Sequence, residues 1–233
     1  MVTETREVSG FDRVEVCCGM QLFLVQGDQE GLTLEGDDNI LAEIESNVRG
    51  GTLSIRYRDM TGPYVIRPSR PVIVNLQMAN IHGIEISGGG SLEAENIESD
   101  EIALAFSGGS HGTIGGLQTT LASFALSGGA QATVDTLTAD VHQLEASGSS
   151  QMSVNGGTVT TQQVEANGSS SYYASELQSE NCALEASGGS EAHVWVTESL
   201  QVRASGSSRV EYSGNPAIDQ EASGGSRIVS VNR

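Results

Sequence analysis

Lysine is absent from this 233-residue chain, and all eleven of its basic residues are arginines. Thirty Asp and Glu residues oppose them, which leaves a formal net charge of −19. The segment 71–202 holds fifteen acidic residues and neither Arg nor Lys. A surface of this kind repels phosphate backbones and anionic lipid headgroups, so we expect no nucleic-acid partner and no binding to a membrane surface.

Aromatic residues and long apolar runs are also scarce. Phe, Trp and Tyr make up 4% of the chain while glycines number 29, so the core has to consist of small and aliphatic side chains. No run of about 18 apolar residues occurs, and we therefore expect no membrane insertion by this chain. The opening stretch "MVTETREVSGF" shows no signal peptide.

Cysteine is limited to Cys17, Cys18 and Cys182, without a Cys-x-x-Cys pair or any metal-binding spacing. We expect no metal site and no cofactor. Neighbouring residues of a strand point to opposite faces, so at most one of Cys17 and Cys18 faces inward. The prediction is one or two buried thiols that act as small apolar side chains. A disulfide between Cys18 and Cys182 is the alternative, and no spacing supports it.

The strongest signal is an internal repeat, a Ser-Gly or Asn-Gly step that recurs at an almost constant spacing and shortens slightly in the last two intervals. Its first residues are Ser87, Ser107, Ser127, Ser147, Asn167, Ser187, Ser205 and Ser223. Apolar residues alternate with polar ones around each step, which indicates strands rather than helices. The repeat is too short for a helical hairpin or a propeller blade.

We therefore predict an all-β fold, a parallel β-helix or β-solenoid with coils of about 20 residues, in which equivalent residues of successive coils touch. Two inward columns run through Leu184 and Ala186, and the polar Gln220 at the end of the first indicates a cap. The glycine of each step supplies positive φ at a corner. The position two residues later holds only small residues, whose hydroxyls we expect to bond along the stack. A phosphate-binding loop is disfavoured because no helical pattern follows any glycine.

Residues 1–80 are predicted to form irregular β coils and a cap continuous with the solenoid, and residues 81–233 the regular solenoid with eight Ser-Gly corners. The stretch "NILAEIES" allows a turn of helix. The segment from Met60 to Pro71 holds three of the four prolines and predicts an excursion loop. His142, Gln162 and Cys182 share one predicted inward column, a mildly polar seam.

Candidate binding residues lie on the outer face, because the repeated residues are all explained by stacking. The column directly after the corner varies freely, and with the outward-facing Trp195 it supplies the candidates His111, Gln131, Gln151, Glu191, Trp195 and Arg209. Polar side chains on a flat face suit a glycan or a cell-envelope protein. No catalytic residue is predicted.

Enzymatic and calcium-binding functions find less support in the sequence. A polysaccharide lyase needs a basic residue and a group that neutralises the substrate carboxylate, and the central coils hold no Arg or Lys. A hydrolase needs paired carboxylates at a defined separation, whereas Asp135 with Asp140, or Glu93 with Glu95, are dispersed on turns and outer faces. Calcium at Asp37–Asp38 or Asp28–Glu30 is disfavoured because the glycine-rich calcium repeat is missing.

The segments "SGFDRVEV", "LEGDDNI" and "GGTLSI", followed by the ladder of "SGGS" and "SGSS" steps, resemble the family called putative auto-transporter adhesin, head GIN domain. The likeness covers roughly residues 6–230. It implies a right-handed β-helix on an exported or envelope-attached bacterial protein, in the periplasm, on the cell surface or secreted. Relatives are described as adhesin-like or, by fold analogy, as pectinase-like, and the family offers no catalytic residues to carry over. We therefore expect a non-enzymatic adhesion, scaffold or ligand-binding module, with a pectinase-like polysaccharide-active enzyme as the alternative.

Overall fold

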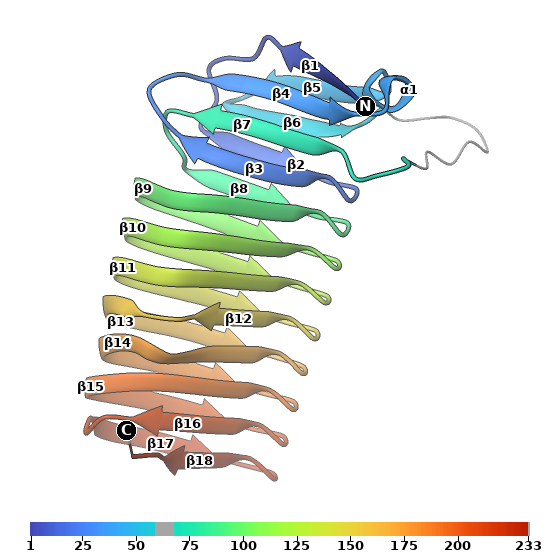
Figure 1. Ribbon diagram of the computed structural model, residues 1–233. Helices are drawn as coiled ribbons and strands as arrows, with labels where there is room; N and C mark the ends of the chain where they lie inside the picture. Colours follow the sequence, from blue (N-terminus) through green and yellow to red (C-terminus); the bar gives the residue numbers. More distant parts are fainter. Residues whose placement is uncertain (59–67, 233) are drawn as a thin grey trace.

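The computed structural model describes residues 1–58 and 68–232 and shows a β-solenoid whose coils stack along one axis (Figure 1). The predicted excursion at Met60–Pro71 lies largely outside these residues. Within the described ranges the single helix is α1 (Asp38–Leu41), so the turn of helix that the sequence allows occurs in the first half of "NILAEIES", whereas Ile44 begins a strand. The predicted fold class, an all-β solenoid of short stacked coils, is confirmed.

Each regular coil crosses the molecule twice. Its first half lies in the sheet nearer the viewer in Figure 1, here the front sheet, and its second half lies in the back sheet. The strands of these coils are β8 (Gly83–Ile86), β9 (Ser91–Phe106), β10 (His111–Leu126), β11 (Gln131–Ala146), β12 (Gln151–Val154), β13 (Gly157–Ala166), β14 (Ser171–Ala186), β15 (Glu191–Ala204), β16 (Arg209–Ser213), β17 (Ala217–Ala222) and β18 (Arg227–Ser230). They pair in parallel at the predicted offsets, as in His111 with Gln131 and Glu191 with Arg209.

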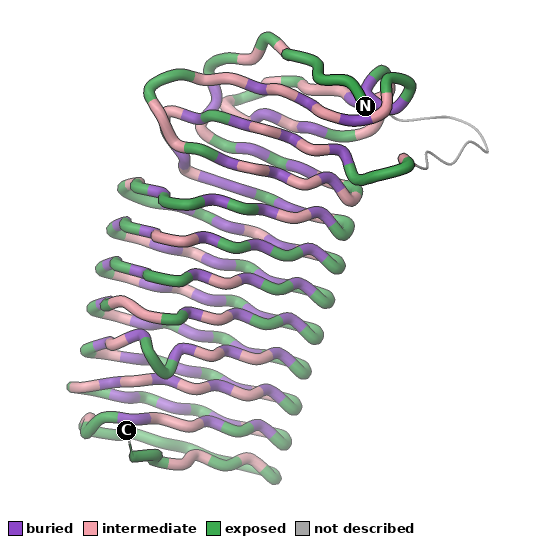
Figure 2. The backbone as a smooth tube through the Cα atoms, viewed as in Figure 1, coloured by how far each residue is buried: buried purple, intermediate pink, exposed green. Residues whose placement is uncertain are grey.

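The core fills the space between the two sheets, and buried residues alternate with more exposed ones along most of the length of the strands from β9 to β15 (Figure 2). The predicted columns through Leu184 and Ala186 are buried as far as Val202 and Ala204, whereas Gln220 and Ala222 of the last coil are exposed. Large side chains fill the space left by small ones across the core. The ring of Phe106 occupies the space beside Gly112, where a Cβ atom would lie 2.4 Å from that ring. Each such buried large side chain contributes about 1.5–3 kcal/mol of apolar burial.

The corners follow the predicted chemistry. The glycine of every Ser-Gly or Asn-Gly step has positive φ, and at Gly148 φ is +74°. The carbonyl of Gly148 accepts a hydrogen bond of 2.7 Å from the amide of Ser169, one coil further on. Two residues after the glycine, the hydroxyl of Ser150 donates to the carbonyl of Leu126 at 3.4 Å and that of Ser170 donates to Ala146 at 3.3 Å. The hydroxyls therefore bond along the stack, as predicted.

The predicted polar column is also buried in the interior. His142 and Gln162 have no exposed surface, and Cys182 is 4% exposed. The Gln162 side chain accepts a hydrogen bond of 2.7 Å from the Tyr172 hydroxyl and donates one of 2.9 Å to the Ser179 hydroxyl. These bonds compensate for the removal of the Gln162 amide from water.

The first coil in the sequence is not the first coil in space. β2 (Arg13–Val16) and β3 (Gln21–Gln26) form one coil, and β6 (Thr52–Tyr57) and β7 (Ile73–Met78) form another. β2 pairs in parallel with both β6 and β8, and β3 pairs in parallel with both β7 and β9. The β2–β3 coil is therefore inserted between its later neighbours. Antiparallel pairs complete this end of the stack: β4 (Gly31–Gly36) with β7, β1 (Val2–Arg6) with β4, and β5 (Ile44–Arg49) with β6.

The prediction for Cys17 and Cys18 was wrong, because these residues form a disulfide with each other. They lie at the corner between β2 and β3 rather than within a strand, so the rule of opposite faces does not apply. Cys18 has a φ of +68° and stacks on the next corner, where its amide donates to the carbonyl of Ser87 at 3.2 Å. It takes the place that glycine holds in the other corners. Cys182 is the buried free thiol that was expected.

Candidate functional site

The predicted column on the outer face exists as a continuous ladder in the front sheet. Strand pairing places its members in register from coil to coil: His111, Gln131, Gln151, Ser171, Glu191, Arg209 and Arg227. Successive members lie about 4.8 Å apart along the stack. The structure thus brings five of the six candidate residues onto one line. Trp195, the sixth, lies further along β15 and is half-buried beside Gly214.

A second outer column runs parallel to the first, two residues further along each strand. It contains Tyr173, His193 and Glu211, which pair in register across β14, β15 and β16. None of these three residues is among the candidates predicted from the sequence. The signal for them was the same alternation that predicted the first column, because every second residue of a strand shares a face.

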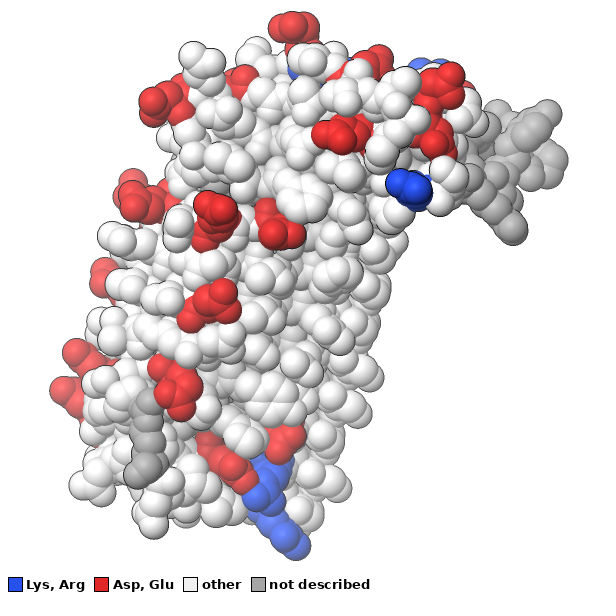
Figure 3. All heavy atoms as spheres, in the orientation of Figure 1, with Lys and Arg blue, Asp and Glu red and all other residues white. Residues whose placement is uncertain are grey.

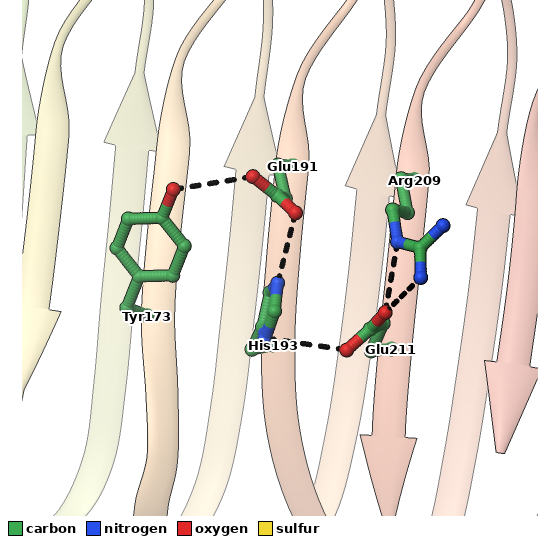
Figure 4. Close-up of polar contacts among 5 residues, drawn as sticks. All are labelled: Tyr173, Glu191, His193, Arg209 and Glu211. Carbon is green, nitrogen blue, oxygen red and sulfur yellow. Dashed lines mark hydrogen bonds and ion pairs between the residues drawn. The ribbon is translucent and has the colours of Figure 1, made fainter. Parts of the chain in front are cut away.

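The two columns meet in a polar network, which we call the β14–β16 cluster: Tyr173, Glu191, His193, Arg209 and Glu211 (Figure 4). The carboxylate of Glu191 accepts hydrogen bonds from the Tyr173 hydroxyl and from Nε2 of His193, both at 3.1 Å. Nδ1 of His193 lies 3.5 Å from Oε2 of Glu211. Arg209 donates from Nε to Oε1 of Glu211 at 2.8 Å, and its Nη2 contacts the same oxygen.

Ring packing and charge fix the cluster further. The rings of Tyr173 and His193 meet edge to face with centroids 5.3 Å apart. The hydrogen bond from His193 lowers the pKa of Glu191, and the bond from Tyr173 and the charge of Arg209 act in the same direction. Glu191 is therefore ionised at neutral pH. Both carboxylates already have donors, so the cluster offers a preorganised polar surface rather than a free acid and a free base.

Arginine reaches the outer faces only near the two ends of the solenoid. Figure 3 shows acidic side chains scattered over the front and arginines near its two ends, in keeping with the segment 71–202 that has no basic residue. The candidates His111, Gln131 and Gln151 lie on coils between these ends and do not reach the β14–β16 cluster. Among the described residues no group of three His, Cys, Asp or Glu side chains is arranged to hold a metal ion.

The fold is shared with solved bacterial proteins. The chain is similar to a putative adhesin from Parabacteroides distasonis, with 18% identity over 99% of this chain and 96% of that chain and a TM-score of 0.86. It is similar to a putative adhesin from Parabacteroides merdae, with 16% identity, 99% and 95% coverage and a TM-score of 0.87. A putative lipid binding protein from P. distasonis is 20% identical, with 99% and 96% coverage and a TM-score of 0.88.

No curated protein matches the chain. In the part of the chain that the structure describes, no helix has the length and apolarity needed to cross a membrane. The model of the family described as "Putative auto-transporter adhesin, head GIN domain" matches residues 10–216. The chain therefore belongs to this head GIN domain family.

Proposed function

We propose that the protein is a non-enzymatic binding module outside the cytoplasm, and that it contacts its ligand through the front sheet around the β14–β16 cluster. The observation that carries this proposal is that recurring and varying residues have different roles in the coil. The residues that recur, such as the corner glycines and serines, serve the stack through backbone bonds and burial. The outward residues of the front sheet vary, and on β14–β16 they form an ordered polar and aromatic patch.

Membership of the adhesin family supports a role in adhesion, and the disulfide supports the location. Disulfides persist in oxidising compartments such as the periplasm or the cell exterior, and they are rare in the cytoplasm. The bond between Cys17 and Cys18 therefore agrees with an exported protein. The disulfide points to this location independently of the family resemblance.

The patch suits a saccharide. Tyr173 and Trp195 offer partly exposed aromatic side chains with polar tips, a type enriched in binding interfaces. Glu191, which is bonded to Tyr173, and Arg209, one coil further on, offer an acceptor and a donor for hydroxyl groups. Because the cluster is already held by internal hydrogen bonds, little ordering entropy is lost when a ligand binds. An envelope protein is the other partner class that this surface fits.

The pectinase-like alternative is less well supported. Of the carboxylates considered for hydrolysis, Asp135 accepts a hydrogen bond of 2.9 Å from the Asn155 side chain and Asp140 lies elsewhere, on the edge of the solenoid. In the cluster, Glu191 and Glu211 are both engaged by cationic or hydroxyl donors. Release of reducing sugar or unsaturated uronide from pectin-type polymers, abolished by a single carboxylate substitution, would establish catalysis and refute our proposal.

The test is a glycan array together with a pull-down from bacterial envelope extract, using wild-type protein and two variants. Tyr173→Ala removes the ring and the donor to Glu191, and we expect about a tenfold loss of affinity for any glycan that the wild type binds. Thr133→Ala is the matched control, since Thr133 occupies the same outer column two coils away. Equal affinities of the two variants, or no wild-type signal above that of an unrelated acidic solenoid, would end the proposal.

A further inference from the structure

A groove runs along the edge of the solenoid opposite the Ser-Gly corners, where the front strands bend into the back sheet. It has a volume of about 810 Å³, and its lining comes from residues 80–82, just before β8, and from β9, β10, β11, β13 and β14, which belong to five consecutive coils. Sites for ligands commonly have volumes of about 300–1,000 Å³. The groove lies on a different surface from the β14–β16 cluster, and nothing in the proposed function uses it.

The lining follows the repeat, because most coils contribute two or three residues from equivalent positions. The floor consists of Ser99, Thr119, Ala139 and Val159, and one wall of Glu98, Gln118, Thr138 and Thr158. The other wall carries Asp100, Asp140, Thr160 and Glu180. Its carboxylates lie two coils apart, which corresponds to about 10 Å, and Thr160 lies on the coil between Asp140 and Glu180.

These three carboxylates lack counter-charges. In the described part of the chain no hydrogen bond or ion pair engages the side chains of Asp100, Asp140 or Glu180. No intramolecular partner is close in sequence, since residues 71–202 contain neither Arg nor Lys. The contrast with the β14–β16 cluster is direct, because Glu191 and Glu211 there are each paired. A row of unpaired carboxylates in a groove attracts cations and focuses the field of a protein whose net charge is −19.

We propose that this edge groove binds a linear chain that carries ammonium groups, with the ammonium groups on Asp100, Asp140 and Glu180. The length of the groove along the stack requires an extended ligand, and the spacing of the carboxylates requires ammonium groups two coils apart. The threonine and glutamine side chains between them supply donors and acceptors for hydroxyl groups. An amino-sugar oligomer with unacetylated amines carries both ammonium and hydroxyl groups. A linear polyamine carries ammonium groups alone.

The experiment is isothermal titration with three probes: a glucosamine hexasaccharide, its fully N-acetylated counterpart, and spermine. The groove variant is Asp100→Asn, Asp140→Asn, Glu180→Gln. The control variant is Glu145→Gln, Glu165→Gln, Glu185→Gln, which removes three carboxylates from one column of the back sheet. Both variants change the net charge by the same amount, so they differ only in where the charge is lost. Circular dichroism confirms that each variant is folded.

We expect an amine-bearing probe to bind the wild type and the N-acetylated probe not to bind. The groove variant should bind about tenfold more weakly, and the control variant within about twofold of wild type, because exposed charges farther away than the Debye length are screened. Binding of the hexasaccharide but not spermine identifies an amino glycan as the source of the ammonium groups, and the reverse identifies a polyamine. Absence of binding by both, or equal weakening in the two variants, overturns the proposal. Either result leaves the front-sheet function untouched, since Tyr173→Ala tests that function separately.

Discussion

His142 is buried without a hydrogen bond, and this makes the stability of the solenoid depend on pH. Its side chain has no exposed surface and packs between the rings of Phe124 and Tyr172, with centroid separations of 5.5 and 5.9 Å. Neither ring nitrogen has a hydrogen-bond partner. Burial lowers the pKa of His142 from 6.5 to about 4, and the nearby backbone of Ala122 opposes this shift only in part.

The sign and size of the effect follow from linkage. Between pH 6.5 and 4 the unfolded chain binds a proton at His142 that the folded chain excludes, so the free energy of unfolding falls as the pH falls. A pKa difference of about 2.5 units corresponds to about 3 kcal/mol, of which about 2 kcal/mol is lost by pH 5. For a domain of this size that loss lowers the melting temperature by about 4–8 °C.

The measurement is urea unfolding of the wild type and of His142→Leu at pH 7.5 and pH 5, followed by circular dichroism and by Trp195 fluorescence. Leucine suits the site, since Leu200 occupies the same inward column. Carboxylates titrate alike in both proteins, so the difference between them isolates His142. We expect the free energy of unfolding of the variant, relative to that of the wild type, to increase by about 2 kcal/mol between pH 7.5 and pH 5. His111→Gln, at an exposed histidine, is the control and should show no such growth.

A stability difference between His142→Leu and the wild type that is the same at both pH values would refute the reasoning. It would mean that His142 titrates in the folded protein as it does in the unfolded chain. The ring would then have access to water, and the inward column would be assigned to the wrong face.

The other predictions concern the corners and the cysteines. Gly148→Val should lower the free energy of unfolding by about 3 kcal/mol or more, because a Cβ atom at this positive φ would lie 2.7 Å from the carbonyl oxygen of Gly128. Gly109→Ala, where a Cβ atom meets nothing within 4 Å, is its control in the same urea titration, and equal losses would contradict the corner geometry. Burial raises the pKa of the Cys182 thiol to about 12, so iodoacetamide should label Cys182 only after unfolding. After mild reduction of the native protein, Cys18 should be the first cysteine that iodoacetamide labels, as judged by mass spectrometry. Labelling of Cys182 in the native state would contradict its burial.

The sequence by itself determined the regular coils, since the spacing of the Ser-Gly steps is also the register of the parallel pairs. In a stacked solenoid each residue contacts its counterpart one repeat away, so the repeat length predicts the contacts. The inward columns through Leu184 and Ala186, the hydroxyl bonds of Ser150 and Ser170, and the buried seam at His142 all follow from that relation. Alternation likewise predicted which face Glu191, Arg209 and Trp195 occupy.

The tertiary structure alone decided how the N-terminal strands are ordered, because no constant offset governs them. β2 and β3 pair with strands that come much later in the chain, and these partners are known only once the strands are seen side by side. One signal was present in the sequence: "VEVCCGMQL" matches "IEISGGGSL" position by position, with Cys17 and Cys18 in place of the Ser-Gly step. The β14–β16 cluster and the edge groove also depend on side-chain geometry. A repeat predicts which residues lie one coil apart, but it does not predict where their side chains bond, nor where the surface is concave.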